Sequence, residues 1–102
     1  MASRLKLHEE LCETLGNLNV YFQPPASVKM KYPCIRYSKL APDLKRADNQ
    51  IYNNTNKYEV TVIDADPDSD IADKILNNFK MCRIDRYYVA DNLNHTVLEL
   101  FY

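Results

Sequence analysis

Glycine is almost missing from this chain: Gly16 is the only one among 102 residues. Phosphate-binding loops of the P-loop and Rossmann types need several glycines, because the backbone must approach the phosphate closely. The G-x-S-x-G elbow of many hydrolases needs a glycine on either side of its serine. The sequence therefore excludes these nucleotide-binding and nucleophile motifs.

Cysteine is also scarce, with Cys12, Cys34 and Cys82 odd in number and far apart. Without a C-x-x-C pair, the sequence supports neither a zinc knuckle nor a dithiol redox site, and free thiols fit a reducing cytoplasm. No stretch approaches the ~20 apolar residues that a membrane span needs, and no signal peptide is evident. We therefore expect a protein made in the cytosol, without export and with no membrane partner.

Neither sign of charge dominates: 13 Lys and Arg residues face 14 Asp and Glu residues, a net charge of −1. This balance gives no global attraction to nucleic acid or to an anionic membrane. The length predicts a single domain over residues 1–102 with a modest core. Domains of this size often gain stability from partner subunits.

The stretch VIDADPDSDIADK contains five aspartates and poses the first question about function. As a calcium loop beginning at Asp64, it would need glycine at position six and glutamate at position twelve. The sequence has Ser69 and Ile75 there. The spacing therefore argues against an EF-hand, and we expect neither a metal nor a cofactor.

A junction between a strand and a helix explains the same aspartates better. Asp66 is a good N-cap, and Pro67 suits the first helical position, where a missing N–H has no consequence. Asp68 and Asp70 would then lie in the first turn, where the helix dipole favours negative charge. The apolar spacing continues to Phe79, which predicts a helix from Pro67 onward.

Hydrophobic periodicity elsewhere predicts one more helix and five strands. The expected helix runs from Arg4 to a stop at Gly16, and the expected strands occupy residues 20–23, 32–41, 57–65, 82–90 and 95–102. The composition of DNLN predicts a hairpin turn between the last two strands. The order α-β-β-β-α-β-β predicts an α+β domain: a mostly antiparallel sheet of about five strands with both helices packed on one face. Residues 42–56 are polar, and we expect them to form a long arm or loop.

Catalytic chemistry has weak support in the sequence. His8 and Cys12 lie one helical turn apart, but no third group is evident to orient a nucleophile pair. The carboxylates that acid–base catalysis would need are already explained by the helix entrance. We therefore expect a protein that is not an enzyme.

One stretch, KMKYPCIRYSK, interleaves Lys and Arg with Tyr32 and Tyr37. Such a pattern can form a platform for single-stranded nucleic acid. The alternative, which we prefer, is that these tyrosines pack half-buried on a sheet while the basic side chains face solvent.

The succession NVYFQPP…KYPCIRYS, RADNQIY, KYEVTVIDADPDSDI, CRIDRYYVADNLNH and LELFY resembles the small tail completion, or tail terminator, proteins of long-tailed bacteriophages and prophages. The likeness covers nearly the whole chain and consists of strand patterns with turn signals. It implies a structural virion protein that forms a ring, typically a hexamer, at the head-proximal end of the tail tube. Such a ring stops tube growth and joins the tail to the head. It implies no catalytic residues.

The resemblance also implies partners: other copies of the chain, the major tail tube protein, the head–tail connector, and phage DNA that passes through the lumen without being read. The residues that we expect to make oligomer or partner contacts are Arg46, Asp48, Asn49, Tyr52, Asp91 and Asn92. Ordinary turn and surface chemistry remains the alternative for all six. Two other functions stay open, namely a different head–tail connector protein (a stopper or adaptor) and a single-stranded nucleic-acid-binding module.

Overall fold

Two helices and five strands make up the fold of this chain. The computed structural model describes residues 4–24, 29, 31–40, 56–79 and 81–102. The elements are α1 (Arg4–Leu15), β1 (Val20–Phe22), β2 (Cys34–Leu40), β3 (Lys57–Asp64), α2 (Ile71–Asn78), β4 (Cys82–Ala90) and β5 (Leu93–Phe101). The predicted arm at residues 42–56 lies outside the described residues, apart from Asn56.

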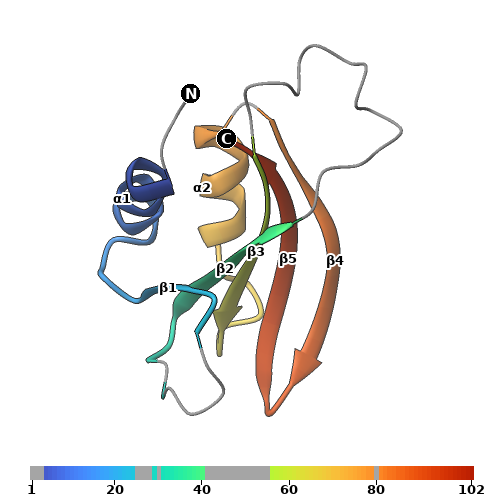
Figure 1. Cartoon of the computed structure of the whole chain (residues 1–102). Helices are drawn as coiled ribbons and strands as arrows, with labels where there is room; N and C mark the ends of the chain where they lie inside the picture. Colours follow the sequence, from blue (N-terminus) through green and yellow to red (C-terminus); the bar gives the residue numbers. More distant parts are fainter. Residues whose placement is uncertain (1–3, 25–28, 30, 41–55, 80) are drawn as a thin grey trace.

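The five strands form one sheet in the order β1-β2-β3-β5-β4 (Figure 1). β1 pairs with β2 in parallel, and every other neighbouring pair is antiparallel. The C-terminal strand β5 lies inside the sheet, where Leu98 and Leu100 are completely buried. The short strand β1 and the long strand β4 are the two edges. The predicted α+β class, element order and mostly antiparallel sheet are confirmed.

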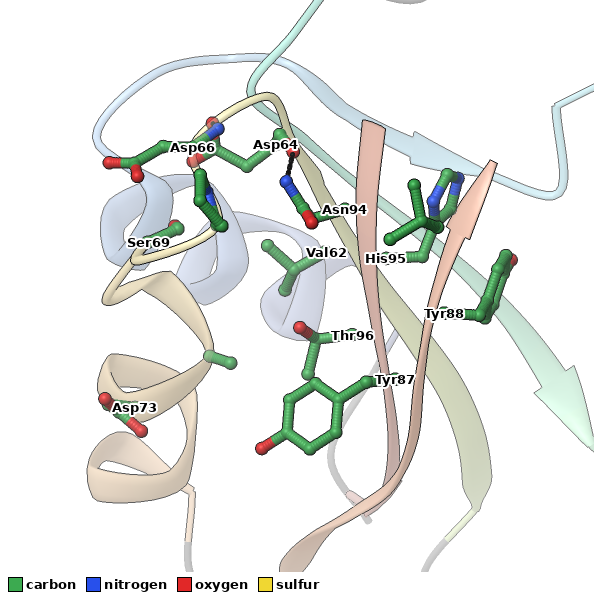
Figure 2. A pocket seen from close by; sticks show the side chains of 13 residues that line it. Val62, Asp64, Asp66, Ser69, Asp73, Tyr87, Tyr88, Asn94, His95 and Thr96 are labelled. Atoms are coloured by element: carbon green, nitrogen blue, oxygen red, sulfur yellow. Dashed lines mark hydrogen bonds between the residues drawn. The ribbon is translucent and has the colours of Figure 1, made fainter. Parts of the chain in front are cut away.

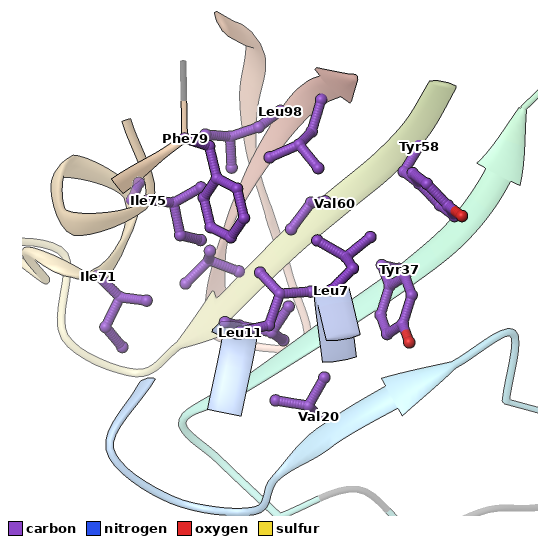
Figure 3. Close-up of a cluster of buried hydrophobic side chains, with 14 residues drawn as sticks. Leu7, Leu11, Val20, Tyr37, Tyr58, Val60, Ile71, Ile75, Phe79 and Leu98 are labelled. Atoms are coloured by element: carbon purple, nitrogen blue, oxygen red, sulfur yellow. The ribbon is translucent and has the colours of Figure 1, made fainter. Parts of the chain in front are cut away.

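Both helices cover the same face of the sheet, and the main core lies beneath them (Figures 1 and 3). Leu7 and Leu11 of α1 and Ile75 of α2 are completely buried against the sheet residues Val60 and Leu98. Burial of a side chain of this size stabilises a fold by roughly 1.5–3 kcal/mol. The apolar stripes of the two helices therefore determine which face they cover.

Helix α1 ends as its sequence predicts. Gly16 has a φ of +87°, a left-handed conformation that glycine adopts without steric penalty. Its N–H donates to the carbonyl of Cys12 at 2.9 Å, which completes the last turn. The chain then turns into the short strand β1.

The predicted start of α2 was wrong by four residues. The helix begins at Ile71, and its N-cap, Asp70, makes no side-chain capping hydrogen bond. Asp68 and Asp70 therefore lie before the first turn, which contains Asp73 instead.

Two successive turns account for the late start of this helix. The N–H of Asp66 donates to the Asp64 side chain at 3.0 Å, and the N–H of Asp68 donates to the Asp66 side chain at 2.9 Å. Aspartate side chains that bond the backbone two residues onward compete with helix formation. The chain becomes helical only at Ile71, where burial of an apolar side chain favours it.

Smaller differences concern strand ends. Gln23, predicted as the last residue of the first strand, has a φ of +45° and lies outside β1. β5 begins at Leu93, two residues earlier than predicted, because the hairpin turn is tighter than the sequence suggests.

Leu98 provides a test of the core. We expect Leu98→Ala to lower the free energy of unfolding by about 2–5 kcal/mol, because it removes a completely buried side chain and leaves a cavity. Urea denaturation followed by circular dichroism measures this loss. The control is Leu18→Ala: Leu18 is 84% exposed, so the change should have little effect. Equal effects of the two changes would contradict the described packing.

Candidate functional site

A groove of about 510 Å³ lies on the helix-bearing face, between the start of α2 and the β4–β5 hairpin (Figure 2). Val62 of β3 and Thr96 of β5 line its sheet side, and Ala72 of α2 lines its helix side. Tyr87 and Val89 of β4 form its outer wall. Apolar atoms make up the larger part of the groove lining.

The strand register explains why Tyr87 and Val89 face this groove. Tyr87 pairs with Thr96 and Val89 pairs with Asn94, so both point to the same face as the core residue Leu98. Neither helix covers them: the Tyr87 side chain is 70% exposed and that of Val89 is 68% exposed. Large apolar side chains on the core-facing side of a sheet are normally buried, so the exposure of Tyr87 and Val89 sets them apart from the core residues.

The outer edge of β4 has two different halves. The first half carries Arg83, Asp85 and Arg86, and its register is broken by a bulge between Ile84 and Arg86. Charges and bulges are the usual protection of an edge strand against pairing with other strands. The second half, Tyr87–Ala90, has no charge, and all four residues are exposed. Within β4, only this second half lacks the charges and bulges that prevent pairing with another strand.

Acidic side chains line the α2 side of the groove. Asp64, Asp66 and Asp73 take part in the lining, and the described lining residues include no Lys or Arg. The Nδ2 of Asn94 donates to the carbonyls of Asp64 at 3.3 Å and Ala65 at 3.4 Å, which ties the hairpin to this junction (Figure 2). The groove is therefore apolar at its base and negative at one rim.

The structure describes two of the six predicted contact residues. Asp91 and Asn92 form the two-residue hairpin turn, with φ values of +55° and +62°. Such turns need positive φ at both positions, which explains the choice of Asp and Asn. This places them at the tip of the hairpin, next to Val89 in the groove wall. Their role in contacts stays a prediction. The other predicted contacts, Arg46, Asp48, Asn49 and Tyr52, lie outside the described residues.

Substitutions at Asn92 test the described hairpin turn at the end of the groove wall. We expect Asn92→Val to lower the free energy of unfolding by about 1–2 kcal/mol, because a β-branched residue is strained at positive φ. Asn92→Gly should leave stability nearly unchanged, since glycine accepts this conformation. Thermal unfolding measures both, and equal destabilisation by the two changes would argue against the described turn.

The thiols and histidines lack the features of an activated nucleophile. Burial raises the pKa of Cys34 and of Cys82 to about 11, and the pKa of Cys12 is also raised, mainly by burial. Nucleophilic cysteines need a lowered pKa. The Nδ1 of His8 lies 2.8 Å from the hydroxyl of Tyr37, so this histidine partners a tyrosine.

His8 gives the fold a dependence on pH. Burial, followed by the nearby positive charge of Arg4, lowers the pKa of His8, although Glu9 opposes this. The unfolded chain therefore binds a proton more readily than the folded one, so stability is full above the unfolded pKa of about 6.5 and falls as the pH drops below it.

The matched variant is His8→Gln, which keeps a polar side chain without an imidazole. We expect its free energy of unfolding to fall less than that of the wild type between pH 7 and pH 5, as urea titrations at each pH would measure. Parallel pH dependences of the two proteins would show that His8 does not contribute.

The tyrosine–lysine stretch is only partly exposed. Tyr37 is 1% exposed and packs among Phe22, Tyr58 and His8, whereas Tyr32 is 45% exposed. A platform for single-stranded nucleic acid needs several open rings. The buried Tyr37 leaves one open ring in this stretch.

Two features are absent from the described residues. No group of three or more His, Cys, Asp or Glu side chains there is placed to hold a metal ion. In the same part of the chain, no helix has the length and apolar character to cross a membrane.

Sequence reasoning missed Tyr87 and Val89. The run Tyr-Tyr-Val-Ala was recognised as part of a strand, but periodicity does not say which strand lies at the edge of a sheet. The available signal was the contrast between this uncharged run and the charged residues Arg83 to Arg86 just before it.

Comparisons with known proteins found no match, so the fold and the groove are the main structural evidence about function. No family model, no curated protein and no solved structure matches the chain.

Proposed function

We propose that this chain is a structural subunit of a ring at the head-proximal end of a long-tailed phage tail, where it stops growth of the tail tube and joins the tail to the head. The resemblance of its strand and turn pattern to tail completion proteins supports the proposal. Among the structural features, the exposed half of β4 beside the open groove carries it furthest, because such a surface suits association between protein subunits.

The remaining chemistry is consistent with a structural role. The thiols have raised pKa values, and the described histidines contact a tyrosine hydroxyl and a backbone carbonyl. The nearly neutral net charge suits a protein that surrounds DNA without reading its sequence. These features support assembly by shape and surface complementarity.

Loss of the gene separates the proposal from its nearest alternative. In the phage or prophage that carries this gene, its deletion should give tails of abnormal length, measured by electron microscopy. Tails of normal length beside unjoined heads would indicate a stopper or adaptor of the head-side connector instead. Restoration by the gene in trans controls for effects on neighbouring genes.

The buried ring of Tyr37 weighs against the nucleic-acid alternative. Binding to single-stranded DNA would also fall steeply with salt. If the purified protein is retained on such DNA at low salt and released at high salt, this would favour a nucleic-acid-binding module over the proposed ring-shaped assembly.

The polar arm gives a further test. We expect deletion of residues 44–54 to impair tail assembly while the domain stays folded, because the arm is predicted to reach a neighbouring subunit or the tube. Circular dichroism checks the fold, and electron microscopy of the phage checks assembly. Normal tails made with the shortened protein would refute the role of the arm.

A further inference from the structure

We propose that copies of this chain associate head to tail. The groove beside Tyr87 in one copy would receive the surface around Lys31 of the next copy. This inference rests on the proposed ring and names the two surfaces that meet in it. The first surface is the groove surface, defined by Tyr87, Val89, Asp64, Asp66 and Asp73. The second is the lysine surface, defined by Lys29, Lys31 and Tyr32.

The two surfaces lie beside opposite edge strands of the sheet, and both are at the end where β2 begins and β3 ends. The groove surface is next to β4, the outermost strand on one side. The lysine surface is next to β1, the outermost strand on the other side, and the N–H of Lys31 donates to the Tyr21 hydroxyl of β1 at 3.2 Å. A contact between two different surfaces of identical subunits is heterologous, and it generates a ring when the rotation between copies closes.

The charges of the two surfaces are complementary. Three aspartates belong to the groove surface, whose described lining contains no Lys or Arg. Lys29 and Lys31 are exposed on the lysine surface, and neither forms an ion pair with another described residue. Complementary charges favour the correct encounter and disfavour two like surfaces meeting face to face. The charges therefore select the head-to-tail arrangement over a symmetric dimer.

Apolar contacts supply the rest of the fit. Tyr87 and Val89 expose most of their side chains at the groove, and Tyr32 is 45% exposed beside Lys31. Interfaces place aromatic side chains at their centre, with charged residues around them. Tyr32 would lie against Tyr87 and Val89, while Lys31 would face the aspartate rim.

The acidic rim also decides between a second copy and nucleic acid as the occupant. Three carboxylates beside the groove repel a phosphate backbone, whereas the exposed lysines of another copy are attracted to them. A second copy is therefore the occupant that we propose.

Charge reversal tests the contact. Asp73→Lys and Lys31→Glu should each weaken self-association of the full chain by roughly tenfold or more, measured by sedimentation equilibrium, because each places like charges together. In an equimolar mixture, the altered groove of the first variant can pair with the altered lysine surface of the second, since both charges of the pair are then reversed. The unaltered surfaces can pair with each other. Mixing the two variants should therefore restore association.

Matched controls keep the change of charge but move it off the two surfaces. Glu13→Lys reverses an exposed acid of α1 that is outside the groove lining, and Lys39→Glu reverses another exposed lysine. Both should associate like the wild type. A further variant, Tyr87→Ser, should weaken association without lowering the unfolding temperature, because the aromatic side chain of Tyr87 is mostly exposed. Circular dichroism on every variant identifies any change of fold.

Each outcome is decisive for the contact. Weakening by both reversals with recovery on mixing supports it. Association that is unaffected by the reversals, or that is not restored on mixing, overturns the contact but leaves the proposed ring standing. A wild-type chain that stays monomeric up to about 1 mM also overturns it. The tail phenotype of the gene deletion tests the proposed function separately.

Discussion

The hydrogen bonds from the backbone N–H groups of Asp66 and Asp68 to the aspartate side chains two residues earlier decide where α2 begins. Each bond satisfies a backbone donor locally, so the chain turns twice before it becomes helical at Ile71. The helix is left with only eight residues, about 12 Å in length. Strand β4 has nine residues and spans about 30 Å. A helix that short leaves much of the strand uncovered.

The uncovered part of β4 is the origin of the groove. Had the helix begun at Pro67, four more residues would have extended it by about 6 Å along the sheet, toward the hairpin tip. The two aspartate turns place carboxylates beside Tyr87 and Val89, which the helix leaves exposed on the edge strand. The same run of acids that suggests a metal site in the sequence makes one rim of this groove.

The opposite face of the sheet carries a group of ion pairs around Glu99. Glu99 lies between Lys57, at 3.0 Å, and Arg83, and no described helix covers this face. The hydrogen bond from Lys57 is the main cause that lowers the pKa of Glu99, while partial burial opposes it. Arg83 thus belongs both to this ion-pair group and to the charged half of β4. The uncharged half, Tyr87–Ala90, has no comparable protection.

The sequence by itself determined the local structure of this protein. Periodicity gave the number, type and order of the elements, Gly16 marked the end of α1, and Asp91 and Asn92 marked the hairpin turn, because these features depend on neighbours in the chain. Only the tertiary structure decided that β4 is an edge strand, that α2 is too short to cover it, and that Tyr87 therefore faces an open groove. Those properties depend on which strands pair and on how far a helix reaches across them. A one-dimensional pattern does not contain that information, since the same alternation suits a central strand and an edge strand equally well.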